Sequence, residues 1–150
     1  MDKLYKIGLV VSNLIFPLVG WTGDWVTFFA GLLSAVRSGW MHWNRTDLSI
    51  KMDYIGMYAL GLATVGFLTN HYLIILLVPI WFLFAKNFRD QYKVALIFLM
   101  ACLIDQNIIS ILLFGVSYAS RQFSLGTKWE KLGHIVFHIV AGIAIYMIYQ

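Results

Sequence analysis

The sequence predicts an all-α, polytopic membrane protein: one domain over residues 1–150, with seven transmembrane helices and a cytoplasmic N-terminus. Three observations lead to this fold class. Only 12% of the residues are charged, whereas a soluble domain carries about a quarter. The mean hydropathy is +0.78. Finally, apolar runs long enough to cross a bilayer alternate with short polar turns along the whole chain.

The apolar runs set the predicted spans, and each has its own justification. The first contains Pro17, which is tolerated in a membrane helix where neighbouring helices satisfy the freed carbonyl. The third is rich in glycine, with Gly56, Gly61 and Gly66, which favours close helix packing. Ser12 and Asn13 in the first span are expected to make interhelical hydrogen bonds, with contact to a substrate as the alternative. The seven predicted spans are residues 4–21, 25–43, 53–68, 72–85, 88–105, 107–124 and 129–149.

The segment from residue 88 to 124 allows two interpretations. It is either one long helix or two spans that turn at the polar triplet of residues 105–107. Charge favours the turn, because seven spans place every Lys and Arg on one side, which the positive-inside rule makes cytoplasmic. These basic residues therefore serve as loop anchors, and the pI of about 9.3 does not imply nucleic-acid binding. They are Lys3, Lys6, Arg37, Arg45, Lys51, Lys86, Arg89, Lys93, Arg121, Lys128 and Lys131.

Three histidines are predicted to meet near the cytoplasmic side. His134 and His138 are four residues apart in the last span, so a helix places them on one face, one turn apart. His42 ends the second span and reaches the same level as His134 under the seven-span topology. Three imidazoles with a fourth position left to water are a typical arrangement for catalytic zinc. Asp53, at the start of the third span, and Ser38, four residues before His42, are expected beside them.

This set of residues has the composition of a hydrolytic site. Zinc lowers the pKa of a bound water and polarises a carbonyl oxygen. Asp53 is a candidate either to accept the proton of the water or to orient the water or a metal ligand. Ser38 is a candidate hydrogen-bond donor to a developing oxyanion. Each residue also has a structural interpretation. A single buried histidine is more often a packing residue, Ser38 fits a helix-packing position, and Asp53 is a possible N-cap of the third span.

The order and spacing of these residues resemble the CREST superfamily. The resemblance rests on Ser38-x-x-x-His42, on Asp53 eleven residues later, and on His134-x-x-x-His138 in the last span. It implies a seven-helix bundle with an intramembrane zinc ion held by the three histidines, Ser38 and Asp53 beside it, and hydrolysis of an amide or ester bond in a lipid.

Two branches of the superfamily remain open. The eleven-residue step to Asp53 is similar to alkaline ceramidases, as is the glycine before His134. The stretch from Lys51 to Gly56 is more similar to the adipoQ-receptor and hemolysin III group. We therefore expect a zinc-dependent hydrolase acting on the amide of a ceramide-like membrane lipid. One alternative is a lipid sensor or receptor with a mainly structural zinc, and another is a metal-free channel that uses its histidines for protons.

Overall fold

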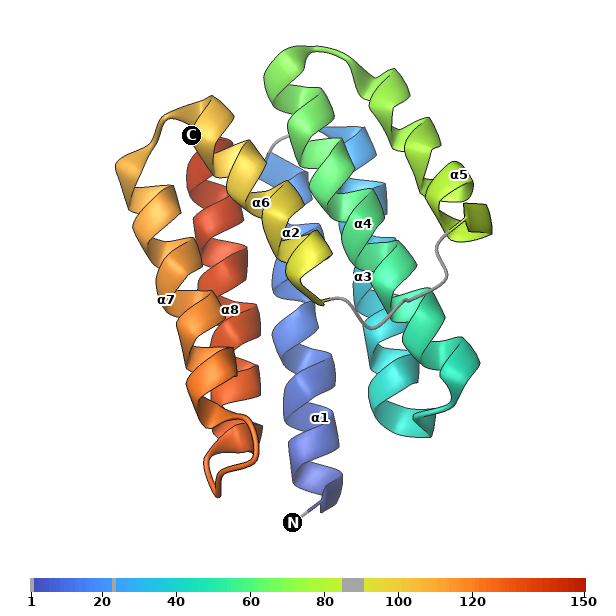
Figure 1. Cartoon of the computed structure of the whole chain (residues 1–150), viewed down its shortest axis with the longest axis vertical. Coiled ribbons are helices and arrows are strands. Elements are labelled where there is room, and N and C mark those ends of the chain that lie inside the picture. Colours follow the sequence, from blue (N-terminus) through green and yellow to red (C-terminus); the bar gives the residue numbers. More distant parts are fainter. Residues whose placement is uncertain (1, 23, 85–90) are drawn as a thin grey trace.

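The structure is a computed structural model that describes residues 2–22, 24–84 and 91–150 (Figure 1). Throughout these ranges the chain is helical and forms no strand, which confirms the all-α fold class. Lys86 and Arg89, two of the basic residues in the charge pattern, lie outside the described residues. The helices are α1 (Asp2–Asn13), α2 (Ile15–Thr22), α3 (Trp25–Asn44), α4 (Asp47–Thr69), the 3-10 helix η1 (Tyr72–Leu76), α5 (Leu77–Phe84), α6 (Gln91–Asp105), α7 (Ile108–Ser124) and α8 (Glu130–Ile148).

The third predicted span begins earlier than its apolar residues suggest. Arg45 ends α3 in the left-handed conformation, with φ 51°. The next residue, Thr46, is the N-cap of α4 and forms a capping box with Ser49. Asp53 therefore lies inside α4, and the interpretation of Asp53 as an N-cap is wrong. The reason is local. The side chains of Thr46 and Ser49 accept hydrogen bonds from each other's backbone N–H groups, so the helix already begins about two turns before Asp53.

The polar triplet of residues 105–107 separates two helices. Asp105 ends α6, Gln106 adopts a left-handed conformation with φ 57°, and the helical residues of α7 follow Asn107. The side chain of Asn107 accepts a hydrogen bond from the Ile109 N–H at 3.0 Å and so caps α7. A single continuous helix across this segment is thus excluded.

The first predicted span is interrupted in its middle. Leu14 separates α1 from α2, and its N–H bonds to the Val11 carbonyl rather than to a carbonyl four residues earlier. Pro17 is the physical cause, because it has no N–H to donate to the carbonyl of Asn13 and its ring crowds that carbonyl. The Asn13 side chain in turn donates to the Leu9 carbonyl at 2.8 Å.

The helices are arranged so that α1 lies between α3 and α8 (Figure 1). Helices α7 and α8 run side by side as a hairpin, and α3 and α4 form a second one. The start of α1, the α3–α4 connection and the α7–α8 turn all lie at the same end of the molecule (Figure 1). The last turn of α3 and the first turns of α8 are therefore at one level.

Glycines allow α3 to approach its neighbours backbone to backbone. A Cβ added at Gly31 would lie 2.6 Å from the Phe16 carbonyl oxygen of α2. A Cβ at Gly56 of α4 would lie 2.8 Å from the Cα of Ser34. Such short spacing is typical of helix packing in membranes, where small residues let backbones meet. It also sets the C-terminal half of α3 close against the first turns of α4.

The surface of the molecule is that of a membrane protein. Three segments are long and apolar enough to cross a bilayer, namely Lys3–Thr22, Asp47–Thr69 and Glu130–Ile148. Large apolar side chains face outward, such as Val36 at 64% and Leu112 at 63% exposure. Serines, threonines and two of the histidines are buried instead. This distribution suits a hydrocarbon solvent, in which apolar groups face lipid and polar groups face one another.

Candidate metal centre

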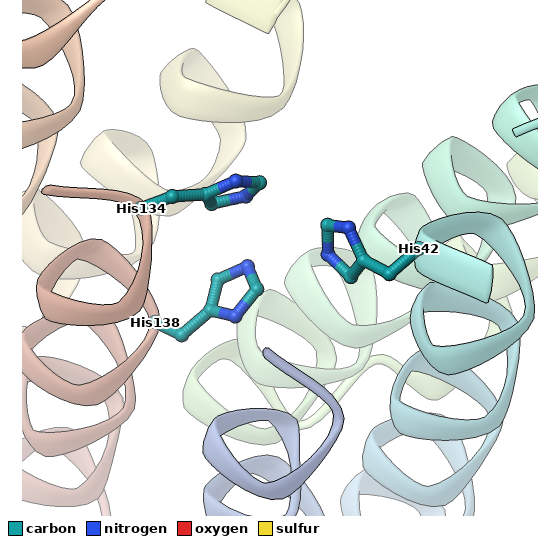
Figure 2. A group of neighbouring side chains, drawn as sticks. All are labelled: His42, His134 and His138. Atoms are coloured by element: carbon teal, nitrogen blue, oxygen red, sulfur yellow. The ribbon is translucent and has the colours of Figure 1, made fainter. Parts of the chain in front are cut away.

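The three predicted histidines meet between α3 and α8. His42 projects from the last turn of α3, and His134 and His138 project from consecutive turns of α8, with the rings turned toward one another (Figure 2). The ring centroid of His42 lies 5.0 Å from that of His134 and 5.8 Å from that of His138. The centroids of the two rings on α8 are 4.7 Å apart. One ring nitrogen from each residue lies within 4.8 Å of the others. The histidines are therefore close enough to hold a metal ion.

Ser12 makes a hydrogen bond with the ring of His138. The Ser12 hydroxyl donates its single proton to the Leu9 carbonyl at 2.9 Å, and its oxygen lies 3.0 Å from Nδ1 of His138. When the proton goes to this carbonyl, the hydroxyl accepts from His138, and the imidazole proton lies on Nδ1. The lone pair of His138 is then on Nε2. A hydrogen bond of this kind from the second ring nitrogen is typical of metal-binding histidines.

Tyr5 makes the equivalent contact with the other histidine of α8. Its hydroxyl lies 3.4 Å from Nδ1 of His134. The ammonium group of Lys131 lies over the Tyr5 ring, 5.3 Å from the ring centroid. Tyr5 and Ser12 are seven residues apart on α1, so they lie on one face of that helix, which faces α8. One helix thus orients both histidines of another.

The ring of His42 has a nitrogen with no protein partner. Its Nε2 atom is buried, and the side chain as a whole is 2% exposed. Leaving a buried polar atom without a partner costs about 1–3 kcal/mol. A metal ion would remove that cost, so this orphaned nitrogen supports the interpretation of His42 as a ligand.

The distances and the donor types fit a tetrahedral metal site. Nitrogen ligands around zinc are about 3.3 Å apart, given Zn–N bonds of about 2.0–2.1 Å. Closing the widest separation from 4.8 Å therefore takes about 1.5 Å, shared between side chains that can rotate. Three imidazoles leave one position open. Imidazole ligands suit zinc, and they also suit copper, iron and nickel.

Ser38 and Asp53 lie in the same cavity as the histidines. Ser38 is buried on α3 and lies near the carboxyl group of Asp53 on α4. One carboxylate oxygen of Asp53, Oδ1, is buried and has no hydrogen-bond partner. Asp53 therefore presents a free acceptor inside the cavity.

The cavity has a volume of about 540 Å³ and changes character along its length. Its size lies in the range of ligand sites in proteins. At one end it contains the three histidines together with Ser38 and Asp53. The other end reaches the main apolar core, where its lining consists of aromatic and aliphatic side chains: Phe16, Met57, Val94, Phe98, Phe114, Ala141 and Ile145.

Several residues of the site are absent from the sequence-based set. Tyr5, Arg45, Arg121 and Glu130 also line the cavity. For Tyr5 a signal exists in the sequence, since its seven-residue spacing from Ser12 puts two hydroxyls on one helix face. The direction of that face toward α8 depends on how α1 is rotated about its own axis against its neighbours, and residue spacing does not define that rotation.

Comparisons of the chain with protein-family models, with curated proteins and with solved structures give no match. The assignment of the site therefore rests on its residues and their geometry.

Proposed function

We propose that this protein is a zinc-dependent intramembrane lipid hydrolase of the CREST type, which cleaves the amide of a ceramide-like lipid with an activated water. One observation carries the proposal: a three-histidine cluster, an acceptor carboxylate and a long apolar cavity are continuous with one another. A water-dependent reaction and an acyl chain can thus share one space.

His42, His134 and His138 would hold the zinc ion. When bound, zinc supplies a water of lowered pKa and polarises the carbonyl of the scissile bond. The choice of zinc over other imidazole-binding metals follows the open three-histidine arrangement and the resemblance of the motif residues.

The protein groups account for the proton movements. Oδ1 of Asp53 takes a proton from the attacking water as the new C–O bond forms at the carbonyl carbon. The proton then passes to the amide nitrogen, whose bond to carbon breaks, and the products are a fatty acid and an amine. Ser38 is buried and lines the same cavity, so we assign its hydroxyl the task of donating a hydrogen bond to the developing oxyanion.

We further propose seven spans with the N-terminus and the metal site toward the cytoplasm. The support is that the start of α1, the α3–α4 connection and the α7–α8 turn lie at one end of the molecule. These segments and the helical turns beside them contain seven of the nine lysines and arginines among the described residues, as the positive-inside rule requires of cytoplasmic loops: Lys3, Lys6, Arg45, Lys51, Arg121, Lys128 and Lys131.

A second candidate function is a lipid sensor with a structural metal. The observation that favours it is that the ligands come from two helices, so an ion would join α3 to α8. A sensor would bind lipid in the same cavity without cleaving it. The two candidates differ in turnover, and not in metal content.

The first test is metal content, measured by elemental analysis of detergent-purified protein. We expect about one zinc per chain in the wild type and a loss of most of it in His42→Ala and His134→Ala. His71→Ala is the matched control, because His71 is exposed and lies outside the cavity. If the wild type purified without chelators contains no zinc, the proposal fails.

The second test separates the enzyme from the sensor. Asp53→Asn keeps the size of the side chain but removes its ability to take a proton. We expect this variant to retain its zinc while fatty-acid release from a ceramide falls by roughly 10²–10⁴-fold. Release is measured by mass spectrometry of the freed fatty acid. Wild-type protein that is loaded with zinc and binds ceramide, yet releases no fatty acid, favours the sensor.

A further inference from the structure

The cavity is layered along the axis of the bundle. Helix α8 lines it from Glu130 to Ile145, a length of about 22 Å at 1.5 Å per residue. Glu130 comes one turn before His134, and the apolar residues Ala141 and Ile145 come after His138. The same order holds on α7, where Arg121 lies toward the turn and Phe114 lies deep. Charged groups thus lie at the mouth of the cavity, the histidines lie at a middle level, and apolar side chains line the deep end.

The mouth has two guanidinium groups and one carboxylate. Arg121 and Arg45 line the cavity from α7 and from the end of α3, and Glu130 lines it from the start of α8. Both arginines lie within electrostatic range of the rings of His42 and His134. The three charged residues of the mouth carry a net charge of one positive unit, before any metal is counted.

The ion pair with Glu130 leaves an N–H group of Arg121 without a hydrogen-bond acceptor. One Glu130 oxygen lies 3.7 Å from Nη1 of Arg121, which is an ion pair without a hydrogen bond. The other accepts from the Gly126 N–H at 3.1 Å, which ties the carboxylate to the α7–α8 turn. Nη1 of Arg121 is buried and has no hydrogen-bond partner. A buried guanidinium N–H without a partner, on a residue that lines a cavity, is a suitable donor for an anionic ligand group.

The positions of these groups relative to the histidines restrict the ligand. Arg45 follows His42 by three residues, and Glu130 precedes His134 by four. The mouth therefore lies about one helical turn, or about 5 Å, outside the metal level. An anion held at the mouth would lie a few bonds from a carbonyl at the metal, with the acyl chain in the apolar depth.

We propose that the site takes an N-acyl lipid with an anionic head group, whose charge is held by Arg45 and Arg121 at the cavity mouth. This inference rests on the proposed function, since it takes the cavity as the site of the lipid. It goes beyond that function by specifying the charge of the lipid head group, which the ceramide-like assignment leaves open.

The test compares two ligands that differ only by a phosphate group on the head. The probes are N-hexadecanoyl-aminoethanol and its phosphate monoester, each titrated into zinc-loaded protein in neutral detergent, with binding measured by thermal unfolding. We expect the phosphate ester to bind at least about tenfold more tightly than the alcohol. In the double variant Arg45→Gln/Arg121→Gln we expect the two affinities to agree within about threefold.

The matched control removes the same charge from the same end of the molecule. Lys3→Gln/Lys128→Gln changes two exposed basic residues that do not line the cavity, and it should keep the preference for the phosphate ester. Zinc content of both double variants verifies that the site is intact. A preference that survives in Arg45→Gln/Arg121→Gln overturns the proposal, since the metal alone would then attract the anion. The proposal is also overturned if inorganic phosphate competes for the site as effectively as the phosphate ester does, because the site would then bind free anions.

The outcome is separable from that of the hydrolase proposal. Preferential binding of the phosphate ester without its cleavage supports the anionic ligand and contradicts the hydrolase. Cleavage of neutral ceramide with no preference for the charged probe supports the hydrolase and contradicts the anionic ligand.

Discussion

At the scale of single residues, the metal centre depends on a hydroxyl that binds no metal. The proton of Ser12 goes to the Leu9 carbonyl, so its oxygen holds the Nδ1 proton of His138. In that arrangement Nε2 of His138 is the nitrogen that would bind a metal ion. The hydrogen bond also limits rotation of the ring, so less freedom is lost when an ion binds.

We predict that Ser12→Ala weakens zinc binding by about 10–100-fold, the usual cost of losing such a partner. Zinc affinity is measured by competition with a chelator of known affinity, and zinc content at saturation should stay near that of the wild type. Ser117→Ala is the control, because Ser117 is also buried and also bonds to α8, but through the Phe137 carbonyl at 2.9 Å. Equal weakening in both variants would mean that Ser12 acts only through packing.

The three histidines follow from the sequence, whereas their supporting groups do not. His134 and His138 share a face because of their spacing, and the parity of the spans brings His42 to their level. The cluster was therefore within reach of sequence reasoning. The contact of Ser12 with His138 depends on the rotation of α1 about its axis, and that rotation is set by packing on both sides.

At the scale of elements, the position of His42 depends on how deeply α3 is set between its neighbours. The backbone of α3 meets α2 at Gly31 and meets α4 at Gly56. Apolar runs predict that these helices exist. They do not predict the break at Leu14, because a membrane helix with a proline is stable in either a kinked or a broken form, depending on its neighbours.

We predict that Gly31→Ala destabilises the protein by about 1–3 kcal/mol, the usual cost of overpacking. The new Cβ would lie 2.6 Å from the Phe16 carbonyl oxygen and 2.9 Å from the Pro17 nitrogen, and backbone atoms cannot rotate away. Thermal unfolding in detergent measures the effect. Gly115→Ala is the matched control, because a Cβ there meets nothing within 4 Å. We expect this control to gain about 0.5–1 kcal/mol from the higher helix propensity of alanine. A Gly31→Ala protein as stable as the control would contradict the close packing of α2 and α3.

At the scale of the whole molecule, the two ends should face different compartments. The α4–η1 connection at His71 and the α7–α8 turn at Lys128 lie at opposite ends (Figure 1). With seven spans, the first is external and the second is cytoplasmic. A chain with six spans would place both on the same side.

We predict that a membrane-impermeant maleimide labels His71→Cys in intact cells and labels Lys128→Cys only after the membrane is opened. Both residues are exposed, and the native Cys102 is buried, so background labelling should be low. Labelling of Lys128→Cys in intact cells would contradict the proposed orientation.

The division of the ligands between α3 and α8 also orders the biosynthesis of the site. Because α8 follows every other helix in the described chain, the ribosome makes His42 long before His134 and His138. During most of membrane insertion the nascent chain thus offers an ion a single histidine of the cluster. The three histidines can come together only once α8 packs beside α1 and α3, so under the proposed function metal loading would mark the completion of assembly.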